Sequence, residues 1–361
     1  MSDTPNNIKS PRLVSLDILR GLDLFLLVFF QPVFMAVVAA VDIPWLNAVA
    51  FQFDHEVWAG FRLWDIVMPL FLFMVGTSMP FSLAKYRGHK SKRAVIIKVF
   101  RRAVILFLLG MVVQGNLLSF DCDRLCYYNN TLQAIAVGYL VGALVTVSFC
   151  IKWRIVIAGI LLIVYWLPMT FGGNIAPDDS FAYMVDRMVI GGHTDDFTYT
   201  WIWSSLNFSV TVLLGSFAGN IIKSGMDKVV VAKHLTFIGL LLVLAGILWS
   251  LQMPIIKRVW SSSMVLYSGG ICFLLMALFY YVIDYRGYTY GLNWLKIYGM
   301  NAITAYVVGE VIDFRSIVVS LSYGLEPIMG EFYSAWLTFG NYLILFFILT
   351  IMYRRKIFIK I

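Results

Sequence analysis

Apolar residues occur in long stretches separated by short polar loops, a pattern typical of helices that cross a bilayer, each of which needs roughly 20 apolar residues. About ten stretches are long enough, and they run approximately over Leu13–Val41, Leu63–Leu83, Val95–Gln114, Leu132–Cys150, Ile155–Phe171, Ile202–Ile222, Leu235–Gln252, Met264–Ile283, Trp294–Ile312 and Phe332–Tyr353. The first is overlong and is expected to tilt, or to break near Gln31-Pro32. The pattern predicts an all-α fold, a polytopic transmembrane helical bundle without a separate soluble domain.

Composition and charge agree with a membrane protein. Of the 361 residues, 60% are hydrophobic and the mean hydropathy is +0.82, whereas soluble domains are about half apolar. Basic residues gather in one set of alternating loops, which holds twenty of them, against five in the other set. The positive-inside rule then predicts an even number of spans with both termini cytoplasmic. It also accounts for the net charge of +8 without nucleic-acid binding.

Titratable residues cluster at the mouth of the second predicted span. Asp54, His55 and Glu56 precede the span, and Asp65 lies just inside it. Charged groups in a bilayer cost roughly 2.5–3.5 kcal/mol each, so they tend to be paired, wetted or functional. Histidine exchanges protons near neutral pH, which makes His55 a candidate for chemistry as well as for an interfacial helix cap. Arg62, one turn before Asp65, is a candidate partner for that acid.

Basic residues also mark the predicted cytoplasmic ends of two spans. Arg20 lies in the first span, either as an interfacial anchor paired with Asp17 or beneath an anionic ligand. Lys98, Arg101 and Arg102 lie on the first turns of the third span, where they serve topology, contact lipid phosphates or clamp the phosphates of a ligand. The sequence contains no Walker A loop and no GxGxxG motif opening a helix.

Two later segments carry polar residues suited to ligand binding. Lys257 and Trp260 lie in the outside loop MPIIKRVWSSS, and Trp260 would serve an interfacial belt or stack on a sugar. Asn301 and Glu310 place an amide and a carboxylate nine residues apart on one predicted span.

No metal site is expected from the sequence. His89, His193 and His234 are expected to be solvated, although His193 could touch a substrate. Cys122 and Cys126 have no nearby histidine, so their C-x3-C spacing is weak as a zinc site, and a disulfide or free thiols remain open.

Together these motifs resemble the heparan-α-glucosaminide N-acetyltransferase family of transmembrane acyltransferases. The matching segments follow the family order over almost the whole chain. They are SLDILRGLDLFLLVFF, His55 with W-x-G at Trp58–Gly60, D-I-V-x-P-L-F-x-F-x-V-G at Asp65–Gly76, MPIIKRVWSSS, GMNAITAYVVGE at Gly299–Glu310 and YRRKIFIKI. Under this resemblance the extra amino-terminal span and luminal domain of lysosomal members are expected to be missing. The chain is therefore expected to be a compact prokaryotic member, one acyltransferase domain over residues 1–361 in the inner (plasma) membrane.

The resemblance implies a reaction and its catalytic histidine. Acetyl from cytoplasmic acetyl-CoA would pass to the amine of a glucosamine-type sugar on the far side of the membrane, without a metal. His55 matches the family histidine. Gln31 stands where the family has a polar residue, usually asparagine, at the end of its first span. His55 would either carry the acetyl group itself or deprotonate the amine in a ternary complex, and the sequence leaves both open.

Under this resemblance the remaining candidates divide by role. Asp65, Asp54 or Glu56 would orient the imidazole, and Gln31 or Asn301 would donate to the oxyanion. The donor phosphates would meet the basic side chains of Arg20, Lys98, Arg101 and Arg102. The acceptor would meet polar and aromatic side chains, namely Asp54, Glu56, Lys257, Trp260, Asn301 and Glu310.

Two other functions remain open at this stage, a sugar transporter and an O-acyltransferase acting on a glycan or lipid. Small residues on several spans permit, without requiring, a homodimer among the membrane lipids.

Overall fold

The computed structural model describes residues 13–84, 92–191 and 199–359, and these are predominantly helical. The long helices are α1 (Val14–Phe25), α2 (Gln31–Val41), α4 (Val67–Ala84), α5 (Lys92–Val113), α6 (Thr131–Ser148), α7 (Ile151–Phe171), α9 (Ser205–Ile222), α10 (Lys228–Ser250), α11 (Ser262–Phe279), α13 (Ala302–Val311) and α16 (Phe332–Arg354). The shorter ones are α3 (Pro44–Ala50), α8 (Phe181–Val189), α12 (Leu295–Met300), α14 (Arg315–Ser322) and α15 (Glu326–Met329). Within these ranges there is no β-strand, only an isolated bridge between Ala59 and Ile256. The all-α class is confirmed.

Eight helices in the described part of the chain are long and apolar enough to cross a membrane. They match eight of the ten predicted stretches, which confirms a polytopic helical bundle. The stretch predicted over Val95–Gln114 is helical as α5, but Lys98, Arg101 and Arg102 make its first half too charged for this set.

The single span predicted over Trp294–Ile312 was wrong as one continuous helix. The chain forms α12 and α13 instead, separated by Asn301, whose backbone leaves the helical region at φ −118° and ψ 39°. Each piece is too short to span a bilayer alone.

The overlong first stretch does not break at Gln31-Pro32. α1 continues through a π-helical turn, η1 (Leu26–Phe30), into α2. A π turn directly before Pro32 lets the helix accommodate a residue that has no N–H to donate.

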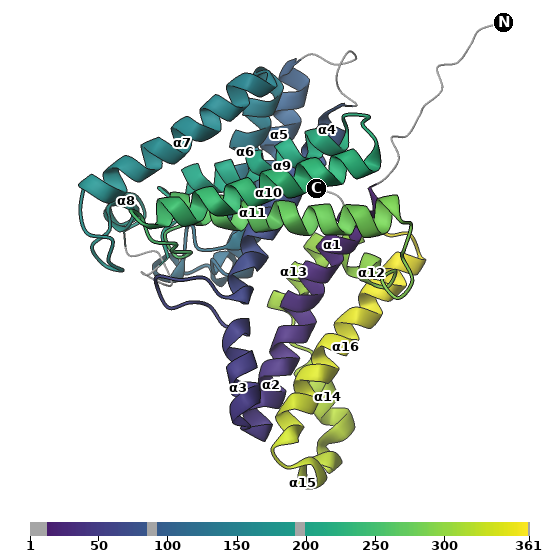
Figure 1. The fold of residues 1–361 in the computed structure, drawn as a ribbon. Helices are drawn as coiled ribbons and strands as arrows, with labels where there is room; N and C mark the ends of the chain where they lie inside the picture. Colours follow the sequence, from purple (N-terminus) through teal and green to yellow (C-terminus); the bar gives the residue numbers. More distant parts are fainter. Residues whose placement is uncertain (1–12, 85–91, 192–198, 360–361) are drawn as a thin grey trace, which may run out of the picture.

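The helices form two packed groups (Figure 1). In the first group α4 packs against α9, α6 packs against both α5 and α9, and α10 packs along α11. In the second, α1 lies against α12 and α2 lies against α16, and this group extends away from the first toward α14 and α15 (Figure 1). α1 contacts α4 and α11, and α13 contacts α5, so the two groups face each other near these three helices of the first group.

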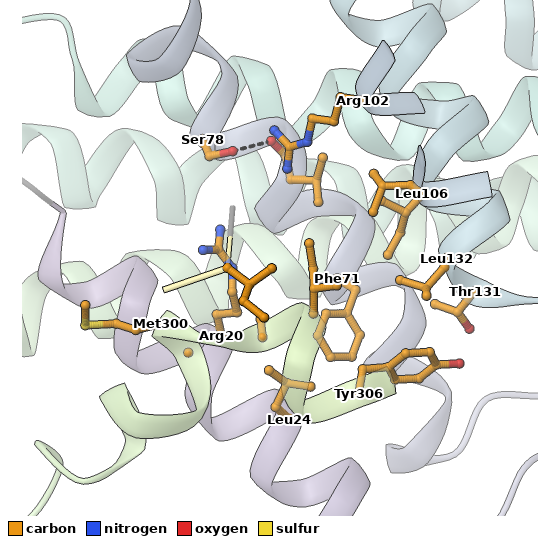
Figure 2. A pocket seen from close by; sticks show the side chains of 16 residues that line it. Arg20, Leu24, Phe71, Ser78, Arg102, Leu106, Thr131, Leu132, Met300 and Tyr306 are labelled. Atoms are coloured by element: carbon orange, nitrogen blue, oxygen red, sulfur yellow. Dashed lines mark hydrogen bonds between the residues drawn. The ribbon is translucent and has the colours of Figure 1, made fainter. Parts of the chain in front are cut away.

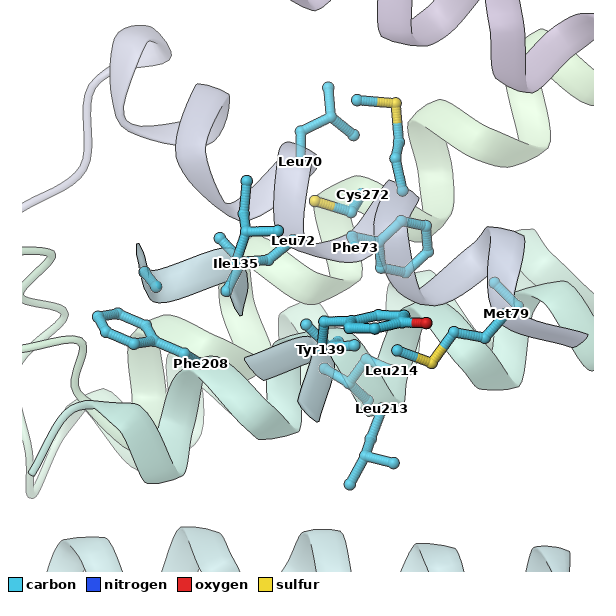
Figure 3. Close-up of a cluster of buried hydrophobic side chains, with 14 of the residues drawn as sticks. Leu70, Leu72, Phe73, Met79, Ile135, Tyr139, Phe208, Leu213, Leu214 and Cys272 are labelled. Carbon is cyan, nitrogen blue, oxygen red and sulfur yellow. The ribbon is translucent and has the colours of Figure 1, made fainter. Parts of the chain in front are cut away.

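The core of the first group is built from large apolar side chains of α4, α6, α9 and α11 (Figure 3). Phe73, Phe208 and Phe273 are each at most 2% exposed, and the rings of Phe73 and Phe273 meet edge to face. Glycines allow the backbones of α4 and α9 to touch, because a Cβ at Gly76 or Gly215 would overlap a carbonyl of the facing helix. This contact fixes α4, whose first turn directly follows the 3₁₀ turn that contains Asp65.

Candidate functional site

The loop that carries His55 is fastened to the α10–α11 loop. His55 lies between two 3₁₀ turns, η2 (Phe51–Phe53) and η3 (Leu63–Ile66). The amide of Gly60 donates to the carbonyl of Ile255 at 2.9 Å, next to the bridge between Ala59 and Ile256. Gly60 has φ +141°, a value that side-chain-bearing residues rarely adopt. This attachment brings Lys257 to His55 although 202 residues separate them.

His55, Asp65 and Lys257 form a close triad. Nδ1 of His55 lies 2.9 Å from Oδ1 of Asp65. Nζ of Lys257 lies 2.8 Å from Nδ1 and 3.2 Å from Nε2 of His55, and 3.5 Å from Oδ1 of Asp65. The side chains of Asp65 and Lys257 are 0% and 6% exposed, whereas that of His55 is 37% exposed.

The hydrogen bonds of Asp65 define the orientation of the imidazole. Its second oxygen, Oδ2, accepts the backbone N–H groups of Arg62 at 2.9 Å and Glu56 at 3.3 Å. Because an ionised carboxylate only accepts hydrogen bonds, Nδ1 of His55 must carry the proton that it shares with Asp65. The lone pair of the neutral ring is then on Nε2, the nitrogen available for chemistry.

Burial and charge act on the triad in opposite directions. Burial lowers the pKa of His55, and the Lys257 ammonium lowers it further, while the hydrogen bond that the ring donates to Asp65 opposes both effects. Burial also lowers the pKa of Lys257 to about 8, against the attraction of Asp65. The site therefore favours an uncharged imidazole near neutral pH.

Arg62 has a different partner from the one that the sequence predicts. Its side chain binds Glu56 through Nε at 3.0 Å and Nη2 at 3.3 Å, and the guanidinium lies 3.6 Å from the ring centre of Phe51. Its Nη1 is 3.8 Å from the exposed carboxylate of Asp54. Asp65 receives only the backbone N–H of Arg62, so Arg62 secures the acids beside His55 and leaves Asp65 to the triad.

His55 opens into a cavity of about 490 Å³, which we call the histidine cavity. One part of its wall is apolar, with Leu27, Trp64, Val67, Met68 and Phe71. The other part is polar or aromatic and comprises Gln114, Asn116, Asn129, Thr131, Tyr199, Trp201, Lys257, Tyr306 and Glu310. A cavity that combines an apolar wall, a polar wall and few charges suits a small hydroxylated ligand.

A second cavity of about 400 Å³, the arginine cavity, adjoins the first. Figure 2 shows the guanidinium groups of Arg20 and Arg102 at one end and the rings of Phe71 and Tyr306 at the other. Phe71, Thr131 and Tyr306 line both cavities, so the two meet at these three side chains, which we call the waist. The arrangement offers a route from a basic end to the imidazole.

Only some of the sequence-predicted residues line these cavities. Arg20 and Arg102 line the arginine cavity, and His55, Lys257 and Glu310 line the histidine cavity. Lys98 and Arg101 are exposed on α5 and line neither.

Three other predicted residues also lie outside both cavities. Gln31 donates to the carbonyl of Phe53 at 3.4 Å, which places it behind the His55 loop. Trp260 is 2% exposed and donates to Thr211, so its ring has no free face for a sugar. Asn301 is buried at the α12–α13 break, and its side-chain amide atoms have no hydrogen-bond partner within the described ranges.

Of the three remaining histidines, one lies in the described part of the chain, and it lines neither cavity. His234 is exposed on α10, while His89, His193 and the side chain of Cys122 lie outside the described residues. No group of three or more His, Cys, Asp or Glu side chains suited to a metal ion occurs in the part of the chain that the structure describes.

Sequence reasoning missed most of the polar wall of the histidine cavity. Gln114, Asn116 and Asn129 come from the ends of the α5–α6 connection, and Tyr199 and Trp201 precede α9. An available signal was the concentration of amides over residues 114–133, which is unusual next to two apolar helices. The contact of Lys257 with His55 had no local signal.

Comparison with known proteins agrees with the arrangement. A family model described as "Heparan-alpha-glucosaminide N-acetyltransferase, catalytic" matches residues 12–253. The chain is 24% identical to proteins named heparan-alpha-glucosaminide N-acetyltransferase from Homo sapiens and from Mus musculus, over 84% of its own length in each case. It spans about half of these relatives, 53% and 54% of their lengths. The region that the family model matches includes His55 and Asp65 and ends shortly before Lys257.

Proposed function

The chain belongs to the heparan-alpha-glucosaminide N-acetyltransferase catalytic family, and we propose that it transfers acetyl from cytoplasmic acetyl-CoA to the amine of an amino sugar across the inner (plasma) membrane. The observation that carries this proposal is the waist between the two cavities. It allows an imidazole held by a buried carboxylate to meet a thioester that enters from a basic end. The membrane would then separate the donor pool from the acceptor pool.

The arginine cavity supports binding of the donor. Arg20 and Arg102 present two guanidinium groups, which suit phosphate oxygens because of their planar, multiply donating geometry. Arg102 also lies 4.6 Å from the ring centre of Tyr139, which restrains its side chain. In this proposal the phosphates of acetyl-CoA stay at the arginines and the pantetheine arm passes the waist toward His55.

The histidine cavity supports binding of the acceptor. Glu310 provides a carboxylate for an ammonium group, while Gln114, Asn116 and Asn129 provide amides for hydroxyl groups. Tyr199 and Trp201 stack on each other at the wall, with ring centres 6.1 Å apart. An amino sugar matches this combination of one anion, several amides and an aromatic wall better than an uncharged lipid does.

The chemistry follows from the orientation of His55. In a ternary complex Nε2 takes a proton from the amine as its nitrogen attacks the carbonyl; the C–N bond forms, the C–S bond breaks, and the thiolate leaves and takes up a proton. In the alternative, Nε2 itself attacks the thioester, the C–S bond breaks and the thiolate leaves and takes up a proton. The amine then attacks the acetyl-imidazole, the amide C–N bond forms, the bond from the acetyl carbon to Nε2 breaks, and the amine gives up its proton to the released imidazole or to water. Both routes need an unprotonated Nε2, which the bond from Nδ1 to Asp65 provides.

The decisive experiment incubates purified protein with labelled acetyl-CoA and a panel of amino sugars. We expect transfer to glucosamine and no transfer by His55→Ala, provided that the variant elutes and melts like the wild type. Unchanged transfer by His55→Ala would remove this residue from the mechanism. Transfer to N-acetylglucosamine as readily as to glucosamine would indicate O-acylation instead.

A matched arginine pair tests the donor end. Arg102 lines the arginine cavity, whereas the neighbouring Arg101 is exposed and lines neither cavity. Arg102→Gln is expected to raise the KM for acetyl-CoA by about tenfold or more, since a charge-assisted hydrogen bond contributes roughly 1.5–3 kcal/mol, and Arg101→Gln should leave it within about twofold. Equal effects of both substitutions would place the phosphates elsewhere.

A sugar transporter is the second candidate, because two cavities that meet at a waist also suit a substrate path through the membrane. Uptake of the sugar into proteoliposomes without acetyl-CoA would favour it. Uptake that depends on acetyl-CoA, with an acetylated product, would favour the transferase.

A further inference from the structure

The ammonium of Lys257 lies against the imidazole of His55 in an unusual way. It is within 3.2 Å of both ring nitrogens, whereas an ammonium in line with one lone pair would lie well beyond hydrogen-bonding distance of the other. Its side chain is only 6% exposed. The ammonium therefore faces the ring of His55 and the carboxylate of Asp65, and has little surface left for a substrate.

We propose that Lys257 is a positioning residue that keeps His55 uncharged, with the proton on Nδ1 and the lone pair on Nε2. The inference rests on the proposed function and adds to it a third residue, from a loop beyond the region that the family model matches. It replaces the role in acceptor binding that the sequence predicts for Lys257.

The balance of charges around the ring supports this role. Asp65 is a single buried carboxylate that already faces one ammonium, so a proton on His55 would place a second cation beside one anion. Removing Lys257 would leave Asp65 to pair with an imidazolium instead. The lysine thus determines which of the two bases carries the positive charge.

The other ionisable groups near the ring do not replace this effect. Asp54 and Glu56, on the same loop, favour a charged ring, but both lie near the guanidinium of Arg62. Across the histidine cavity stands Glu310, with the phenols of Tyr199 and Tyr306.

Arg258, the next residue along the chain, contacts a different side chain. The guanidinium of Arg258 lies 5.1 Å from the ring centre of Tyr199. Lys257 is therefore the cation in contact with the imidazole among the described residues.

The role matters for either chemical route. A protonated ring can neither attack a thioester nor accept a proton from an amine, so the fraction of neutral His55 limits the rate. Lowering the basicity of the ring extends the active form to lower pH. Acetyl transfer would then continue when the extracytoplasmic side of the membrane is mildly acidic.

The test compares the pH profiles of the wild type, Lys257→Met and Lys257→Arg between pH 5 and 8. Activity is lost as pH falls through the pKa of His55, and removing a nearby cation raises that pKa. We expect the acidic limb of kcat/KM to move upward by about one pH unit or more in Lys257→Met. Lys257→Arg keeps the charge and should keep the wild-type limb. An unmoved limb with a raised KM for the amino sugar would assign Lys257 to substrate binding and overturn the proposal.

A second readout does not depend on activity. NMR of histidine-labelled protein in nanodiscs follows the titration of His55, identified by the signal that His55→Gln removes. In the wild type we expect the titration midpoint of the ring to lie below the ordinary histidine pKa of about 6.5. In Lys257→Met we expect the midpoint to lie above that of the wild type. A wild-type midpoint at or above 6.5 overturns the proposal even if Lys257→Met fails to fold. The expected titration without any acetyl transfer would instead refute the proposed function alone.

Discussion

Asp65 is the residue on which the geometry of the site depends. Its two oxygens face His55 and Lys257 on one side and the backbone N–H groups of Arg62 and Glu56 on the other. The carboxylate is completely buried, so each of these interactions occurs in a medium of low polarity, where it is stronger than in water. Asp65 thereby fixes both the tautomer of the imidazole and the path of the loop that carries it.

Replacing Asp65 by asparagine tests this dependence. An amide can present its NH₂ group to Nδ1, which would favour the opposite tautomer and move the lone pair away from Nε2. The equivalent change in a Ser-His-Asp triad lowers kcat about 10⁴-fold, and we expect Asp65→Asn to lower kcat by about 10³-fold or more with little change in KM.

The control for this change is Asp54→Asn. Asp54 precedes His55 directly but is exposed, and its side chain lies 3.8 Å from Arg62. It should retain activity within about threefold, since exposed ion pairs contribute at most about 1 kcal/mol. If both substitutions reduced kcat alike, the loss would come from the loop as a whole and not from the tautomer.

At the scale of the helices, close backbone contact holds the site in place. α4 begins at Val67, two residues after Asp65, and packs along α9 through Gly76 and Gly215, where no side chain has room. A similar contact joins α1 to α12, since a Cβ at Gly21 or Gly299 would overlap the backbone opposite. These contacts bring Arg20 and the polar groups of α13 into one wall.

Two glycine-to-alanine substitutions distinguish the effect of this packing on stability from the effect of helix propensity. Gly215→Ala places a Cβ on the carbonyl oxygen of Phe73 and should destabilise the protein by about 1–3 kcal/mol. Gly159→Ala on α7 meets nothing within 4 Å, and should be neutral or stabilising by up to about 1 kcal/mol. Thermal unfolding in detergent measures both. A drop in melting temperature for both would point to a general sensitivity of the helices to substitution.

The sequence predicted most helices because long apolar stretches have few alternatives in a bilayer. It failed at Trp294–Ile312, since hydropathy averages over a window and does not register the break at Asn301. Within the site, the sequence identified both His55 and Asp65, because they lie only ten residues apart in one polar cluster. Lys257 was singled out for another role, because its contact with His55 arises only when the α10–α11 loop folds onto the His55 loop.

Over the whole molecule, the proposed reaction requires one connected path. The arginines of the arginine cavity come from α1 and α5, and the imidazole comes from the loop before α4; Phe71 of α4, Thr131 of α6 and Tyr306 of α13 line both cavities. Asn130 caps α6 next to this point by accepting the N–H of Leu132 at 2.6 Å. The waist is therefore built from secondary-structure elements of the fold, and in the proposed reaction its width would decide whether a thioester reaches Nε2.

Thr131→Trp is expected to close the waist. An indole in place of a small side chain would occupy the space between Phe71 and Tyr306, while the arginines that hold the phosphates remain. Acetyl transfer should fall by about 10²-fold or more, because even a displacement of about 1 Å from the reacting geometry costs that much. Binding of CoA, measured by calorimetry in detergent, should stay within about threefold of the wild type.

Thr131→Ser is the matched control, since it keeps the hydroxyl and the size of the waist, and it should transfer acetyl at close to the wild-type rate. Retained transfer by Thr131→Trp would mean that the thioester reaches His55 by another route. Loss of CoA binding along with transfer would mean that the donor occupies the waist itself and that the arginine cavity alone does not hold it. Only loss of transfer with retained binding supports a donor anchored at one end of the path and reacting at the other.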